Sequence, residues 1–123
     1  MDVESVRNYC LSLPLVTEDC AFGDDHLLFR VSGKIFACVG LDSPCRMALK
    51  CDADYALELR DRYSAIEPAF HWNKKYWNQL SLPDSLGEAF VRSLIRRSYA
   101  EVVKKLPKSF RNAHPEVVAV VPE

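Results

Sequence analysis

Glycine is scarce in this chain, with only four in 123 residues. Neither a G-x-G-x-x-G run nor a P-loop spacing occurs, so the glycine-rich turns that bind dinucleotides or nucleoside triphosphates are missing. The three histidines, His26, His71 and His114, are far apart in the sequence, and nothing there fixes a nucleophile beside an oriented base. We therefore expect a binding protein and not an enzyme.

Long apolar runs are also missing. No segment approaches the roughly 18 consecutive apolar residues that a membrane span needs, and the N-terminus lacks the basic-then-apolar order of a signal peptide. Hydrophobic residues make up 49% of the chain and charged residues 27%, which is typical of a globular protein and argues against extensive disorder. The sequence thus predicts a cytoplasmic protein with no membrane partner.

Cysteine is present, but not in a pattern that binds metal. There are five cysteines, an odd number that agrees with a reducing compartment, and no C-x-x-C pair that would indicate a zinc site. Most of them stand among apolar residues, where a thiol behaves as a small hydrophobic group. We expect no metal and no cofactor.

The charges are unevenly distributed along the chain. Residues 1–70 carry a formal charge of −5, residues 71–111 carry +6, and residues 112–123 carry −2, which leaves a net charge of −1. Such a chain can present one basic face to a polyanion. The alternative is that the charges intermix in space and cancel, and the sequence does not decide between the two.

The apolar spacing in the first half predicts a helix followed by strands. Asp2 is a good helix N-cap and Pro14 ends the helical pattern. The apolar period then changes to two, and Ser32-Gly33 predicts a tight hairpin because glycine readily takes a positive φ. We expect strands at residues 26–31, 34–41 and 45–50, in an antiparallel meander whose connections are too short for a parallel crossover.

The second half predicts two more helices around another extended segment. A helix capped by Asp52 or Asp54 is expected first, and residues 79–82 are expected to be extended. Ser85 and Glu88 have the spacing of a capping box for a final long helix.

This order of elements is typical of the α+β class, with an antiparallel sheet and helices packed on one face. Because no repeat or linker is visible, residues 1–108 are interpreted as one domain and residues 109–123 as a C-terminal tail. Within the tail, the apolar stretch 117–121 predicts either an added edge strand or a loose segment.

The densest local motif is His-Trp-Asn-Lys-Lys-Tyr-Trp-Asn at residues 71–78. Its lysines can neutralise phosphates, its amides can hydrogen-bond base edges or backbone, and its indoles offer stacking surfaces. In the alternative interpretation, the two tryptophans anchor the core and the polar residues hold a bend. The motif is therefore a candidate nucleic-acid surface, and not yet an assigned one.

Several ordered motifs together resemble the MmcQ/YjbR-like family of small bacterial proteins, from residue 1 to about 108. The resemblance implies a frataxin-like, or CyaY-like, two-layer α+β sandwich and DNA binding through a double-wing arrangement. The matching segments are CLSLP at 10–14, FGDD at 22–25, FRV at 29–31, GKIFA at 33–37, LKC at 49–51, ELR at 58–60, residues 71–78, and SY, VV and LP between 98 and 107.

The resemblance also implies a set of nucleic-acid-binding residues. Tyr76 stands where the family often has a second histidine, which weakens any idea of a histidine pair acting as metal ligands or as acid and base. We expect DNA as the partner, and a monomer or weak homodimer. The candidates are Lys34, Lys50, His71, Asn73, Lys74 and Trp77, which match the family pattern, and Lys75 beside them.

Two other functions remain open at this point. The same aromatic surface could bind a protein or a small ligand if Trp72 and Trp77 line a pocket. Frataxins bind iron weakly on an acidic ridge, and carboxylates of the first half could form a similar site, although arginines interrupt them. The carboxylates concerned are Asp2, Glu4, Glu18, Asp19, Asp24 and Asp25.

Overall fold

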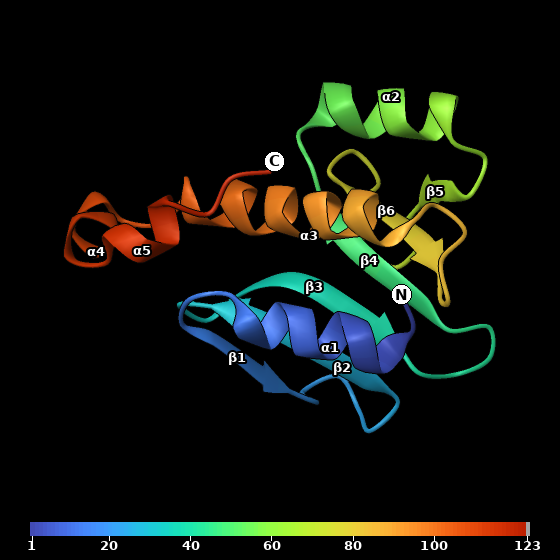
Figure 1. The fold of residues 1–123 in the computed structure, drawn as a ribbon, viewed down its shortest axis with the longest axis horizontal. Helices are drawn as coiled ribbons and strands as arrows, with labels where there is room; N and C mark the ends of the chain where they lie inside the picture. The colour runs from blue at the N-terminus through green and yellow to red at the C-terminus, as the bar shows by residue number, and fades with distance from the viewer. Residues whose placement is uncertain (123) are drawn as a thin grey trace.

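The structure is a computed structural model that describes residues 1–122, so Glu123, the last residue of the predicted tail, lies outside the described residues. Within this range six strands form one antiparallel sheet in the order β1-β2-β3-β4-β6-β5 (Figure 1). None of the helices in residues 1–122 is long and apolar enough to cross a membrane. The elements are α1 (Val3–Ser12), β1 (Val16–Asp19), β2 (His26–Val31), β3 (Lys34–Gly40), β4 (Arg46–Lys50), α2 (Ala53–Arg62), β5 (Ile66–Pro68), β6 (Trp77–Ser81), α3 (Glu88–Val103), α4 (Lys108–Ala113) and α5 (Pro115–Val118).

Local sequence signals set several of these boundaries as predicted. The Asp2 side chain accepts a hydrogen bond from the Ser5 N–H at 2.8 Å and caps α1, and Asp52 caps α2 in the same way through the Tyr55 N–H at 3.1 Å. The hairpin between β2 and β3 turns through Ser32 and Gly33, with φ values of 50° and 78°. A two-residue turn with two positive φ values matches the twist of the strands it joins.

The capping box predicted for the last long helix is wrong. Helix α3 begins at Glu88 with Gly87 as its N-cap, and no side chain caps it. The carboxylate of Asp84 instead holds the turn that leads into α3, because it accepts hydrogen bonds from the N–H groups of Leu86 and Gly87 at 3.0 and 2.8 Å. The same carboxylate pairs with the N-terminal amino group of Met1, so α3 starts beside the start of the chain.

Two other parts of the chain differ from the expected elements. Residues 16–19 form a short edge strand, β1, that the sequence did not single out. The stretch 117–121 begins inside a helix, α5, and is neither an edge strand nor loose, because Val117 is fully buried against the core. Arg96 of α3 then holds the end of the chain by donating to the carbonyls of Val121 and Pro122 at 3.0 and 3.1 Å.

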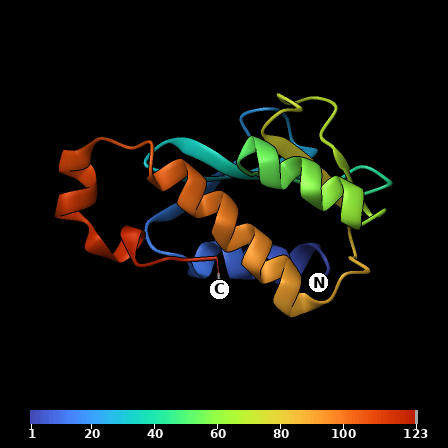
Figure 2. The same ribbon diagram turned by 90° about the horizontal axis from the view of Figure 1, so that it is seen from above.

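The core lies between one face of the sheet and the helices, which confirms the predicted α+β class with helices on one face. All three long helices contribute buried side chains to this main core (Figure 2). The pairing of β2 with β3 shifts between Phe29 and Arg30, and this bulge directs both Phe36 and Ala37 into the core. Tyr99 of α3 packs edge-on against Phe36, with ring centroids 5.3 Å apart.

A single buried hydroxyl joins α3 to two strands. Ser98 is fully buried, its Oγ donates to the Phe36 carbonyl at 2.5 Å, and it accepts from the Lys50 N–H at 2.7 Å. Phe36 lies at the bulge of β3 and Lys50 is the last residue of β4. The hydroxyl therefore satisfies one backbone acceptor and one backbone donor that lie in different strands.

We expect Ser98→Ala to lower the free energy of unfolding by about 2 kcal/mol, because it leaves buried backbone groups of Phe36 and Lys50 without partners. Urea denaturation measures the change. Ser93→Ala on the same helix is the matched control, because the Ser93 hydroxyl only donates to Phe90 of its own helix. The control should shift stability by less than about 0.5 kcal/mol; equal effects would show that the bridge contributes nothing.

Candidate functional site

The face of the sheet that points away from the main core carries no helix within residues 1–122, and we call it the open face. Figure 2 shows α1 and α3 on one side of the strands and the β5–β6 connection on the other. Strand alternation produces the two faces, since successive side chains point in opposite directions. A second, smaller apolar cluster lies on the open face and consists of Leu28, Cys38, Ala48, Ala69 and Trp77.

Trp72 is stacked on Trp77 of this cluster, and the ring of Phe22 lies tilted beside Trp72. Trp77 of β6 is only 8% exposed, and Trp72 covers it with ring centroids 4.3 Å apart and planes inclined by 26°. Phe22, from the connection before β2, lies against the other side of Trp72 at 5.9 Å and is 55% exposed. Rings from two distant loops therefore shield the open face from water.

The loop that carries Trp72 is built from local turns. The Trp72 N–H donates to the Ala69 carbonyl at 3.1 Å, and the Tyr76 N–H donates to the Asn73 carbonyl at 3.0 Å. The side chain of Asn73 also accepts from the Lys75 N–H at 3.1 Å, which is the usual way that asparagine stabilises a turn. The predicted site residue Asn73 thus holds the loop in shape.

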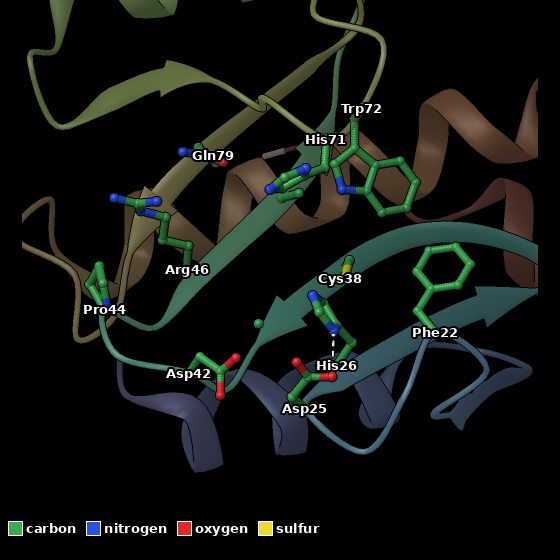
Figure 3. A pocket seen from close by; sticks show the side chains of 12 residues that line it. Phe22, Asp25, His26, Cys38, Asp42, Pro44, Arg46, His71, Trp72 and Gln79 are labelled. Carbon is green, nitrogen blue, oxygen red and sulfur yellow. Dashed lines mark hydrogen bonds and ion pairs between the residues drawn. The ribbon is translucent and has the colours of Figure 1, made fainter.

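A cavity of about 240 Å³ opens on the same face, beside the aromatic stack (Figure 3). Its floor consists of the small residues Cys38, Gly40 and Ala48 on β3 and β4, and Phe22 and Trp72 form a wall. The polar groups on its rim are His26, Asp25, Asp42, Arg46, His71 and Gln79.

One rim histidine has a fixed orientation. Nδ1 of His26 lies 2.9 Å from Oδ1 of Asp25, which leaves Nε2 directed toward the cavity (Figure 3). The hydrogen bond from His26 is the main reason why the pKa of Asp25 is lowered. Burial raises the pKa of the Cys38 thiol on the floor to about 11, so this group stays protonated and is not a nucleophile near neutral pH.

At the other end of β4, two lysines from separate segments lie over one ring, and a third lies close by. Nζ of Lys75 lies 5.5 Å and Nζ of Lys105 lies 5.6 Å from the centre of the Tyr76 ring. The Cys51 N–H donates to the Tyr76 carbonyl at 2.7 Å and places that ring beside the end of β4, where Lys50 lies. We call Lys50, Lys75 and Lys105 the lysine cluster.

The charges in this cluster are not neutralised by ion pairs. Within residues 1–122 the salt bridges do not include any of the three lysines, and the nearby Glu101 pairs with Lys104 at 2.8 Å. The pKa of Lys50 is lowered, first by burial and next by the positive charge of Lys105, and the negative charge of Glu101 offsets only part of this shift. An anion at this position would therefore relieve a repulsion that the fold itself creates.

The structure brings together some of the predicted site residues and separates others. Lys50 and Lys75 lie in the lysine cluster, and His71 lies on the cavity rim. Lys34 pairs with Val31 at the hairpin tip, on the side of the sheet opposite to that of Lys50. Lys74 lies over the ring of Phe70 at 5.3 Å, and Trp77 is buried beneath Trp72.

Sequence reasoning did not single out Lys105, His26 or Arg46 as site residues. Lys105 follows α3 and reaches the open face only because of where that helix crosses the sheet. A signal was present for the other two residues, since each is the single polar residue that opens a strand and is followed by three apolar residues. In the register of the sheet, His26 pairs with Gly40, and Gly40 pairs with Arg46.

The acidic residues of the first half do not form a metal site. No group of three or more His, Cys, Asp or Glu side chains in the described chain is arranged to hold an ion. Two carboxylates are instead paired with the interrupting arginines, Asp19 with Arg30 at 2.6 Å and Glu18 with Arg7 at 2.5 Å. The hydrogen bond from Arg30 is the largest cause of the lowered pKa of Asp19.

A family model described as YjbR matches residues 11–101. The chain belongs to the YjbR family. This confirms the resemblance seen in the sequence. Two curated proteins of Escherichia coli are similar to this chain over most of their length. The uncharacterised protein YbdF of strain O157:H7 is 34% identical over 109 residues, which cover 85% of this chain and 87% of YbdF. The uncharacterised protein YjbR of strain K12 is 26% identical over 112 residues, which cover 90% of this chain and 95% of that protein.

Solved structures show the same YjbR-type fold. The crystal structure of the Deinococcus radiodurans protein DR2400 superposes with a TM-score of 0.84 at 31% identity, covering 91% of this chain and 86% of that one. A Pseudomonas syringae protein superposes with a TM-score of 0.70 at 25% identity, covering 80% and 96%. These YjbR-type relatives establish the fold, and an activity has to be argued from the site itself.

We expect Trp72→Ala to uncover Trp77. The chain has two tryptophans, so all tryptophan emission of this variant comes from Trp77, and its maximum should shift to longer wavelength as water reaches the ring. Stability should fall by about 2 kcal/mol, less than the 3–5 kcal/mol typical of a fully buried tryptophan. Phe70→Ala, which removes an exposed ring on the same loop, should change neither quantity appreciably. An unchanged emission maximum in Trp72→Ala would contradict the stacking.

Proposed function

We propose that this YjbR-family protein binds DNA through the lysine cluster, without catalysing a reaction. The observation that supports the proposal is the convergence of Lys75 and Lys105 at the ring of Tyr76, next to Lys50 at the end of β4. These lysines come from β4, from the loop before β6 and from the end of α3, so the cluster exists only in the folded protein.

The chemistry of the cluster suits phosphate groups. Ammonium groups on flexible stems attract phosphates as point charges and carry no sequence information. Charges that lack carboxylate partners can bind a phosphate without first breaking an ion pair. Tyr76 is half-buried, and the exposed part of its ring provides a surface against which a sugar or a base can pack.

The size of the cluster limits the affinity. Three phosphate contacts give a salt slope of about −2.7 for duplex DNA, which means a loss of roughly 40-fold in affinity between 50 and 200 mM salt. The chain as a whole has a net charge of −1, and its acidic first half repels DNA wherever it approaches. We therefore propose weak, sequence-independent binding that is confined to one end of the open face.

The test compares two double variants that remove the same charge. Lys75→Ala with Lys105→Ala removes two members of the cluster, and Lys34→Ala with Lys74→Ala removes two exposed lysines outside it. Binding of labelled duplex and single-stranded DNA is measured by fluorescence anisotropy at several salt concentrations. The first variant should reduce the duplex slope from about −2.7 to about −0.9.

The control variant should keep most of the slope and affinity of the wild-type protein. Equal weakening by both variants would show that only overall charge matters, and the cluster would then have no special role. No binding of either DNA at about 50 mM salt, where electrostatic attraction is strong, would reject the proposal outright.

A further inference from the structure

The cavity on the open face is separate from the lysine cluster. Arg46 is the first residue of β4 and lines the cavity, whereas Lys50 is the last residue of that strand and belongs to the cluster. Four residue steps along a strand place their Cα atoms roughly 13 Å apart. A ligand in the cavity therefore meets a different set of side chains from a phosphate at the cluster.

The cavity exists because glycine, which has no side chain, is the middle one of three residues that lie side by side on neighbouring strands. Gly40 stands between His26 on β2 and Arg46 on β4, and these two outer residues are roughly 10 Å apart across two strand spacings. A Cβ added at Gly40 would lie 3.9 Å from the His26 ring and 3.8 Å from the Arg46 carbonyl, which is ordinary contact. Glycine at this position therefore leaves open space that a side chain could occupy.

The shape and lining of the cavity suit a flat ring. A dry cavity of about 150 Å³ is enough to hold benzene, so a volume of about 240 Å³ accommodates a bicyclic ring with a small substituent. Phe22 and Trp72 supply the aromatic wall against which such a ring can pack, and Cys38 and Ala48 supply an apolar floor.

The rim offers donors for an anion. The one ion pair of Arg46 within residues 1–122 is loose, with Nε 3.9 Å from Oε1 of Glu67, which leaves its guanidinium donors available. Oε1 of Glu67 already accepts from Gln79 at 3.0 Å. The rings of His26 and His71 point into the same space from opposite sides (Figure 3).

We propose that this cavity binds a small planar ring that carries an anionic group. The ring lies against Phe22 and Trp72, and the anion is held by the guanidinium of Arg46, with His71 beside it. A carboxylate or a phosphate on the ring meets the same donors, so both belong to the proposed class.

The test uses matched pairs of probes. Indole-3-acetate and adenosine 5′-monophosphate are titrated separately into the isotope-labelled protein, alongside their uncharged counterparts indole and adenosine. Amide shifts should centre on Gly40, Ala48 and Gln79, and an anionic probe should bind at least roughly tenfold more tightly than its counterpart. The two arms distinguish a carboxylate ligand from a phosphate ligand. No shifts with either anionic probe at millimolar concentration, or equal affinity of charged and uncharged probes, would overturn the proposal.

Two variants test the geometry. Gly40→Val fills the cavity from its floor and should abolish binding of the probe, while far-UV circular dichroism confirms that the strand is intact. Arg46→Gln should weaken the anionic probe roughly tenfold and leave the uncharged one unchanged. Arg62→Gln, on α2, is the control of equal charge and should leave binding unchanged. If Arg46→Gln bound the anionic probe with wild-type affinity, the role of the rim would be refuted. This outcome does not depend on whether Gly40→Val folds.

Discussion

One buried hydroxyl, that of Ser98, hydrogen-bonds helix α3 to two strands of the sheet. It donates to the bulged strand β3 and accepts from the last residue of β4, so it fixes the helix relative to both strands at once. Apolar packing alone would tolerate sliding of the helix, because it is not directional, whereas two hydrogen bonds to different strands would not. Lys105, just past the end of α3, is thereby placed at the end of β4 beside Lys50 and Tyr76.

The two faces of the sheet differ: one packs against the helices, and the other carries the candidate binding sites. The helix-covered face holds the large buried side chains, such as Phe29, Phe36 and Met47, and stabilises the fold. The open face has small residues at its centre, and rings from two loops cover part of it. Its hollow and its charged groups therefore arise from one pattern: side chains that are short in the middle of the strands and polar or basic toward their ends.

Much of the fold could be predicted from the sequence because its signals are local. Asp2 as a cap, Ser32-Gly33 as a turn and the alternating strands depend on neighbours within a few residues. The site could be predicted only in part. Lys50 and Lys75 were found because they belong to recognisable segments, but their meeting with Lys105 depends on how a helix crosses the sheet. The turn before α3 could not be predicted for a similar reason, since Asp84 holds it and is itself paired with Met1 from the far end of the chain.

The strands at the two borders of the sheet have a further consequence. Both are short: β1 has four residues, and β5 has three and ends in Pro68, which has no N–H to donate. Charged side chains, Glu18 and Asp19, stand on β1 as well. Short, charged and proline-terminated borders offer little template for pairing with another copy. The borders therefore oppose the addition of strands from neighbouring molecules to a sheet whose one face carries no helix within residues 1–122.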